Sequence, residues 1–178
     1  MLRLAIGTVL LFATSASRAE EFGRKGQLSP FGGVAFQHMT QNGTDFTHLT
    51  IRPGAFYFVA DRFALGLQAS AGYDSPGVEN GFRIGHTNTW GLAPAVAVAV
   101  PLGERLSLFP QAAVDFAWSV YSTTGTDHAM AANVFAPLLF IPVPHFFLGL
   151  GPELLWTFDG VNSGRVIIGL SGGVGGWF

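Results

Sequence analysis

Apolar residues alternate with small or polar residues along most of the chain. In the stretch 105–121, Leu106, Val114 and Trp118 fall on one parity, whereas Gln111 and Asp115 fall on the other. Successive side chains of a β-strand point to opposite faces, so this period of two predicts a strand with one apolar face. Strand-like runs of this kind cover 26–38, 48–59, 63–74, 88–100, 105–121, 131–141, 145–158 and 164–178.

The connections between these eight runs are long and short in turn. The long polar connections are 39–47, 75–87, 122–130 and 159–163, and the short turns are 60–62, 101–104 and 142–144. No stretch has a helical period, which excludes folds built from alternating strands and helices. The sequence therefore predicts an all-β fold, an eight-stranded antiparallel up-and-down barrel. Eight strands is about the number at which side chains just fill the interior.

The composition indicates which face of the strands points outward. Only 11% of the residues are charged, against about 25% in an ordinary soluble domain. A soluble barrel would cover its exterior with charged residues, but the less apolar face here is mostly Gly, Ala, Ser and Gln. The apolar face is therefore predicted to face lipid, as in a transmembrane β-barrel, because no apolar run is long enough for a transmembrane helix.

Aromatic residues on the apolar face are spaced as a membrane requires. Phe63 and Tyr73, like Phe146 and Trp156, are ten residues apart, which is about 25 Å along the axis of a barrel with strands tilted near 40°. We therefore predict aromatic belts at both membrane interfaces. Their members are Phe63, Tyr73, Trp90, Trp118, Phe146 and Trp156.

The N-terminus has the features of a secretory signal peptide. Arg3 precedes a short apolar core at 4–13, and the small residues Ser17 and Ala19 flank a plausible cleavage site. We predict a signal peptide over 1–19 and a barrel domain over 20–178. The chain has no Cys, so disulfides and thiol chemistry are excluded, and it has no basic run of the kind that binds nucleic acid.

A few polar and charged side chains interrupt the small-residue face. In a narrow barrel interior, opposite charges must pair, which predicts a network that plugs the lumen. The alternative for the same residues is a narrow pore or a proton path. The predicted members are Arg52, Gln68, Gln111, Asp115, Glu153 and Arg165.

Histidines and serines lie near the predicted long-loop rim. The histidines are His38, His48, His86 and His128, with Asp45 and Asp127 nearby. Their strand ends differ and their spacing fits no metal motif, so we predict neither a metal site nor a cofactor. Ser119, Ser122 and Ser163 are the serines near this rim, but no pattern singles out a nucleophile, so no catalytic residue is predicted.

Six of the eight runs contain a proline. Proline removes a hydrogen bond from the strand ladder, and a closed barrel has no free edge where that loss is harmless. We therefore expect bulges or unpaired ladder sites at these positions. They are Pro30, Pro53, Pro94, Pro110, Pro137 and Pro152.

The signal peptide, the eight alternating runs and a last strand ending in Phe178 resemble the small eight-stranded outer-membrane barrels of Gram-negative bacteria, the OmpA/OmpX-like class. The resemblance implies that the barrel-assembly machinery reads the last strand through Leu170, Val174 and Phe178. Gly176 stands where that class usually has a large apolar residue.

The resemblance also implies a monomer in contact with outer-membrane lipid and lipopolysaccharide, with periplasmic termini and extracellular long loops. The implied role is structural or surface-interacting. The alternative is a lipid A deacylase or acyltransferase acting at the rim, although the His-x-Ser-Asn pattern of the deacylases is absent.

Overall fold

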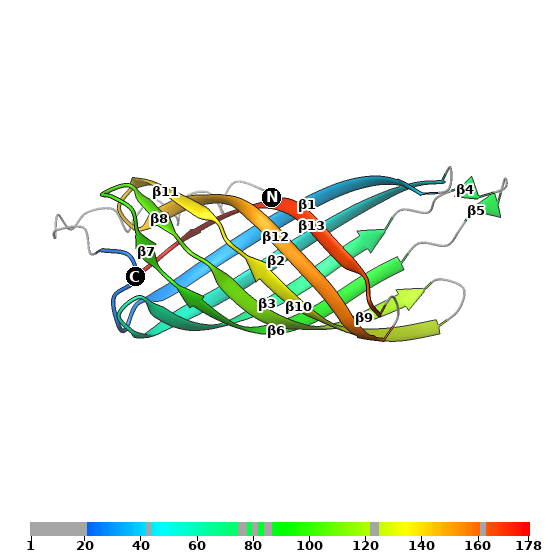
Figure 1. The fold of residues 1–178 in the computed structure, drawn as a ribbon, viewed down its shortest axis with the longest axis horizontal. Helices are drawn as coiled ribbons and strands as arrows, with labels where there is room; N and C mark the ends of the chain where they lie inside the picture. Colours follow the sequence, from blue (N-terminus) through cyan, green and yellow to red (C-terminus); the bar gives the residue numbers. More distant parts are fainter. Residues whose placement is uncertain are drawn as a thin grey trace, which may run out of the picture.

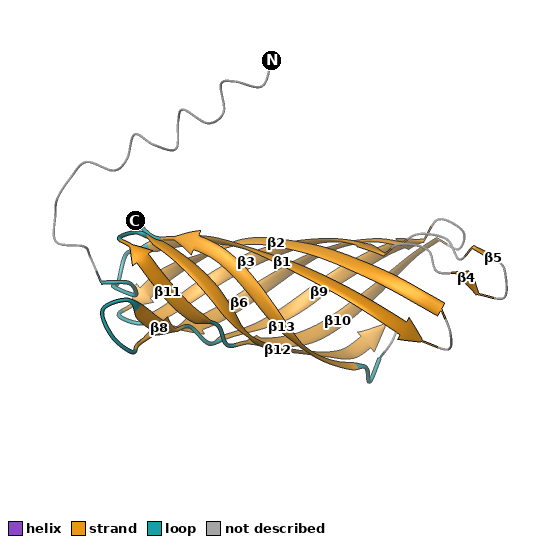
Figure 2. Cartoon of the chain, turned by 90° about the horizontal axis from the view of Figure 1, so that it is seen from above, coloured by secondary structure: helices purple, strands orange, loops and turns teal. Residues whose placement is uncertain are grey.

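The computed structural model describes residues 21–41, 44–74, 78–79, 82–83, 87–121, 125–160 and 163–178. Long antiparallel strands, inclined to the long axis, form a barrel (Figures 1 and 2). The wall strands are β1 (Leu28–Gln41), β2 (Thr44–Ala60), β3 (Phe63–Asp74), β6 (Thr87–Val98), β7 (Val100–Pro101), β8 (Leu106–Leu108), β9 (Gln111–Tyr121), β10 (Gly125–Phe135), β11 (Leu138–Val143), β12 (Phe146–Gly160) and β13 (Val166–Gly176). A separate hairpin joins β4 (Val78–Glu79) and β5 (Phe82–Arg83).

The ring closes where β1 pairs with β13, with Val34 opposite Gly172. Three of the predicted runs are each split in two, into β6 and β7, β8 and β9, and β10 and β11. Counted as runs, the wall has eight members, each antiparallel to its neighbours. The predicted eight-stranded up-and-down barrel is therefore confirmed, whereas the predicted signal peptide over 1–19 lies outside the described residues.

Prolines mark the interruptions of this wall, as the sequence predicts. Pro110 separates β8 from β9, and Pro137 separates β10 from β11. Pro152 of β12 lies opposite Ala136 in the same gap of the ladder. At Pro53 the pairing of β2 with β3 skips two residue pairs, and at Pro94 the pairing of β6 with β9 does the same. The missing N–H of proline accounts for each gap.

The seam between β1 and β13 shows how one gap is repaired. Leu28 and Phe178 exchange two backbone hydrogen bonds, of 2.9 and 3.1 Å. The next exchange in this register would join Pro30 to Gly176, but proline has no N–H to donate. The hydroxyl group of the fully buried Ser29 donates to the Gly176 carbonyl oxygen instead, at 2.9 Å.

Two predicted loops are wrong, because much of their length is strand. The predicted loop 39–47 lies largely within the β1–β2 ladder, which continues to the pair Gln41 and Thr44. The predicted loop 122–130 gives way to β10 at Gly125. Backbone pairing does not need apolar side chains, so strands extend into polar sequence that the alternation pattern does not mark.

The outward face of the wall is apolar and exposed, as predicted. Leu65, Val96 and Leu148 point outward from three different strands. Ala93, Ala95 and Ala97 of β6 and Ala99 directly after it are buried, and they alternate with exposed apolar residues. In the described part of the chain, no helix is long and apolar enough to cross a membrane.

Candidate functional site

The barrel interior is the candidate site, and its contents change along the axis. We call the end with the 60–62, 101–104 and 142–144 connections the short-turn end, and the opposite end the loop end (Figure 1). From the loop end inward, the interior holds an open polar cavity, then a cluster of ion-paired and hydrogen-bonded side chains, and finally a packed aromatic cluster.

The middle of the lumen is held together by Glu153 of β12. Its carboxylate accepts hydrogen bonds from Arg52 of β2, with which it forms an ion pair, and from Ser171 of β13. The side-chain amide of Asn133 on β10 also donates to it, at 2.6 Å. A buried carboxylate is stable only when it is paired and fully hydrogen-bonded, and here three other strands supply the partners. We call these four residues the Glu153 cluster.

The sequence predicts Arg52 and Glu153 as members of this cluster but misses Asn133 and Ser171. Asn133 lies in the run 131–141, whose two faces are both apolar, so its inward direction could not be assigned. Gln68 and Gln111 do meet as predicted, with a hydrogen bond of 3.1 Å between their side chains. Arg165 is exposed at the loop end and is not part of the Glu153 cluster.

Above the Glu153 cluster lies a cavity of about 200 Å3, which we call the vestibule. Arg52 and Asp115 line it deep in the barrel, and the exposed Asp127, His128 and Arg165 line it at the loop end. Asp115 Oδ2 and Arg52 Nε are buried without a hydrogen-bond partner. The other polar side chains that line the vestibule carry hydroxyl groups, namely Thr50, Ser70, Thr89, Ser119 and Thr157.

The lower half of the lumen is filled by aromatic rings, which corrects the prediction of a plug made by polar side chains alone. The rings lie on the face assigned to small residues. They are Phe56, Phe58, Phe109, Phe147 and Trp177, none more than 3% exposed. They fit because neighbouring positions of the wall carry small residues. Gly66, for example, lies directly opposite Phe56 in the β2–β3 ladder, and a Cβ there would collide with the Phe56 ring.

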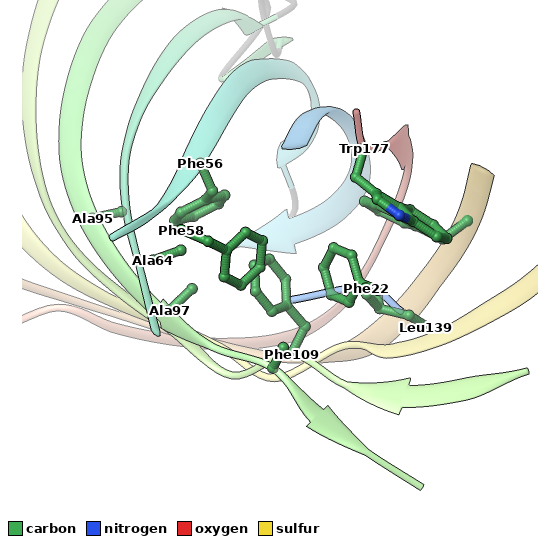
Figure 3. Packing of buried hydrophobic residues seen from close by; sticks show 11 residues of the cluster. Phe22, Phe56, Phe58, Ala64, Ala95, Ala97, Phe109, Leu139 and Trp177 are labelled. Atoms are coloured by element: carbon green, nitrogen blue, oxygen red, sulfur yellow. The ribbon is translucent and has the colours of Figure 1, made fainter. Parts of the chain in front are cut away.

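The chain that precedes β1 closes the short-turn end, which the sequence did not predict. Phe22, only 6% exposed, inserts its ring among those of Phe58, Phe109 and Trp177 (Figure 3). The ring centroids lie 5.3, 5.2 and 5.3 Å away, in edge-on geometry that aromatic pairs favour. We call residues 21–27 the stopper.

Hydrogen bonds fix the stopper to the wall and to itself. Gly26 N donates to Phe58 O at 2.8 Å, and Arg62 N donates to Gly23 O. The buried side chain of Gln27 accepts hydrogen bonds from the N–H groups of Gly23 and Arg24, at 2.8 and 3.0 Å. Gly23 has φ of +98°, and a Cβ there would lie 2.8 Å from Ala99 Cβ, so the stopper requires glycine at this position.

The described interior contains no wide water path past the Glu153 cluster. The void beside Arg52 and Glu153 has a volume of about 30 Å3, and the void beside Phe109 and Phe147 about 10 Å3. A single water needs roughly 10–15 Å3 of such volume. The geometry therefore gives a closed lumen with an open vestibule.

Among the described rim residues, no hydrogen bond joins a serine to a histidine, although Ser119 and His128 both line the vestibule. The His128 side chain is exposed, Ser119 shares a hydrogen bond of 3.2 Å with Thr89, and Ser163 donates to Phe158 O at 3.1 Å. The side chains of His38, His48, His86, Asp45 and Ser122 lie outside the described part. Among the described residues, no group of three or more His, Cys, Asp and Glu side chains could hold a metal.

The predicted membrane-facing residues lie on the outer surface. Trp90 and Trp118 stand opposite each other in the β6–β9 ladder, so they lie at one height. All six predicted belt aromatics are exposed, and so are the three residues of the predicted assembly signal; the signal residues are Leu170, Val174 and Phe178. Their roles remain predictions.

Comparison with known proteins identifies the fold. No protein-family model matches the sequence, and no curated protein matches it. Among solved structures, Neisserial surface protein A (NspA) matches with a TM-score of 0.57 and 13% identity, over 85% of this chain and 96% of that one. The N-terminal β-barrel domain of Pseudomonas aeruginosa OprF matches with a TM-score of 0.52 and 18% identity, over 86% and 98%. The chain has the fold of the small eight-stranded outer-membrane β-barrels, the OmpA-like class.

Proposed function

We propose that the protein is an integral outer-membrane β-barrel with a structural or surface-interaction role and a closed lumen. The observation that carries the proposal is the inversion of the usual burial pattern. Large apolar side chains point outward around the closed wall, while the Glu153 cluster lies inside. A protein surface of this kind is stable against lipid and not against water.

The belt aromatics support the membrane setting. Tyr73, Trp90, Trp118 and Trp156 are exposed toward the loop end, whereas Phe63 and Phe146 are exposed toward the short-turn end. Aromatic side chains at both ends of an apolar band are typical of outer-membrane barrels. In the proposed orientation the short turns, the stopper and Phe178 are periplasmic, and the long loops are extracellular.

Lipid and lipopolysaccharide are the proposed surroundings of the outward face, and the barrel-assembly machinery is the proposed partner of β13. The protein is proposed to act as a monomer without a cofactor. The closing of the ring supports the monomer, since β1 pairs with β13 of the same chain, through 31–34 and 172–175.

The membrane proposal is tested by expressing the full chain in a Gram-negative host. We expect it in the outer-membrane fraction, migrating on gels as a compact species when unheated and as a slower species after boiling. Recovery in the soluble periplasmic fraction, or a mobility that boiling does not change, would contradict the proposal.

The orientation is tested by epitope tags on whole cells. A tag inserted within 75–86 is expected to bind antibody on intact cells. A tag at Gly103, in an exposed short turn, is the matched control and is expected to bind only after the outer membrane is permeabilised. The reverse result would invert the proposed orientation.

Planar-bilayer recording separates the closed barrel from the alternative of a narrow pore. The purified, refolded protein is expected to give no steady conductance steps, because aromatic rings and the stopper fill the lower lumen. Reproducible steps of one size, scaling with the number of inserted barrels, would favour the pore.

A further inference from the structure

The deep part of the vestibule has one more negative charge than positive. Arg52, which lines it, is ion-paired with Glu153 and also lies beside Asp115, so one cation serves two carboxylates. At the exposed rim, Asp127 and Arg165 have opposite charges. Asp115 is then the remaining charged group that lines the cavity, and its Oδ2 atom is buried with no hydrogen-bond partner. A net negative charge inside the barrel, with one carboxylate oxygen unsatisfied, is destabilising, so a neutralising species is expected beside Asp115.

The lining of the vestibule indicates the chemistry of that species. Five hydroxyl side chains surround the cavity, and oxygen atoms of hydroxyl and carboxylate groups are the ligands that hard cations prefer. One charge is missing, which one monovalent cation would supply. A divalent or transition-metal ion would call for a larger set of acidic or imidazole ligands, and none is found among the described residues.

The cavity also offers room and access. Its volume of about 200 Å3 is far above the roughly 10–15 Å3 of such volume that a single water needs, so it has room for a small ion with several waters. The exposed Asp127, His128 and Arg165 form its outer edge, so a hydrated ion can enter from the loop end.

We propose that the vestibule is a binding site for a small monovalent cation, an alkali-metal or ammonium ion, with Asp115 as its counter-charge and the surrounding hydroxyl groups as further oxygen ligands. The ion reaches the site from the loop end and stops there, because the Glu153 cluster and the aromatic rings close the lumen below. The site depends on the interior of the folded barrel and not on its location in the cell.

The test uses the full barrel refolded in uncharged detergent micelles, with chloride salts at constant ionic strength. The midpoint of thermal unfolding is compared in sodium, potassium, ammonium and tetraethylammonium chloride. Tetraethylammonium is the control cation, because its four ethyl groups keep its charge from oxygen ligands. The three small cations also show whether an alkali metal or ammonium is preferred.

We expect the midpoint to rise by about 2–4 °C in at least one small cation, the shift for a domain of this size when a ligand is present at a few times its dissociation constant. The line width of the 23Na resonance should also increase when the barrel is added, and potassium should reverse the increase if it competes. In Asp115→Asn, both effects should disappear. Glu104→Gln, which removes an exposed carboxylate in a short turn at the other end, should retain both.

The proposal is overturned if the wild-type barrel behaves alike in all four salts and leaves the 23Na line unchanged, since Asp115 would then be neutralised by a proton. It is equally overturned if Asp115→Asn keeps the cation dependence of the wild type. The 23Na measurement on the wild-type barrel does not require the variant to fold.

Discussion

Glu153 accepts hydrogen bonds from three side chains of three different strands, Arg52, Asn133 and Ser171. Glu153→Gln keeps the shape of the side chain but leaves the Arg52 guanidinium without its counter-charge. We expect a loss of about 3 kcal/mol in the free energy of unfolding, at the lower end for a broken buried pair. The loss stays at the lower end because the Arg52 side chain is 25% exposed, so water partly solvates its charge. Urea unfolding followed by tryptophan fluorescence measures it.

The double variant Arg52→Met and Glu153→Met is the control for this prediction. Removing both charges leaves no unpaired ion, so the double variant should be more stable than the single variant. A double variant that is less stable than Glu153→Gln would mean that the cluster contributes more than charge pairing.

Phe22 is the residue through which the stopper is anchored. Phe22→Ala removes a buried ring from contact with Phe58, Phe109 and Trp177. The expected cost is about 3 kcal/mol, typical of a buried Phe replaced by Ala. The temperature at which the compact gel species converts to the unfolded one measures the loss, and Lys25→Ala, at an exposed stopper residue, should leave that temperature unchanged. Equal values for the two variants would show that the ring contributes nothing.

The inward or outward direction of a side chain was predictable from sequence where one face of the strand is clearly apolar and the other clearly small or polar. Arg52, Gln68, Gln111 and Glu153 stand out as polar residues on a small-residue face, and the structure places them inside. Phe109 has the same parity as Gln111 and therefore also points inward. Composition favours a lipid-facing position for a phenylalanine, however, and only the small residues on neighbouring strands show why rings fit inside.

Ser29 and Pro30 form the weak point of the β1–β13 seam. Ser29→Ala leaves the Gly176 carbonyl oxygen without its donor. The expected cost is about 1–3 kcal/mol, that of a buried acceptor left unsatisfied. Unfolding in urea measures it.

Restoring a backbone donor should reverse this loss. In the double variant Ser29→Ala and Pro30→Ala, residue 30 regains an N–H that can donate to Gly176 O in the register of the seam. The double variant should therefore be more stable than Ser29→Ala alone. No recovery would show that the hydroxyl of Ser29 does not substitute for the missing backbone donor.

The strands and their interruptions were predictable because both depend on local sequence: the alternation marks the strand, and a proline removes a hydrogen bond at its own position. All six in-strand prolines coincide with gaps in the ladder, as the missing N–H requires. The ends of β1, β2 and β10 were not predictable, because beyond the apolar band pairing continues through polar residues that carry no period. The stopper has no strand pattern, and its place depends on a cavity that several distant strands create together.

At the scale of the molecule, the proposal that the outward face contacts lipid can be tested by introducing an arginine at two different heights along the barrel axis. Leu67 lies near the middle of β3, between Phe63 and Tyr73, and Leu102 lies in a short turn; they are 56% and 57% exposed. In a lipid bilayer, Leu67→Arg should cost about 2–4 kcal/mol, and Leu102→Arg about 0–1 kcal/mol. Equilibrium unfolding from lipid vesicles measures both.

Equal and small costs for the two arginine variants would contradict the membrane assignment. In water, both substitutions at such exposed positions would change stability by less than about 0.5 kcal/mol. The comparison is sensitive because the two leucines differ in height along the barrel and hardly at all in exposure.

The stopper has a consequence for the order of folding. The rings that receive Phe22 come from three distant parts of the sequence: Phe58 on β2, Phe109 between β8 and β9, and Trp177 after β13. No partly formed sheet brings these three rings together, so the seat for Phe22 exists only once the last strand has met the first. The stopper is therefore the last segment to dock. The moment at which residues 21–27 become protected from proteolysis during folding would then report when the ring closes.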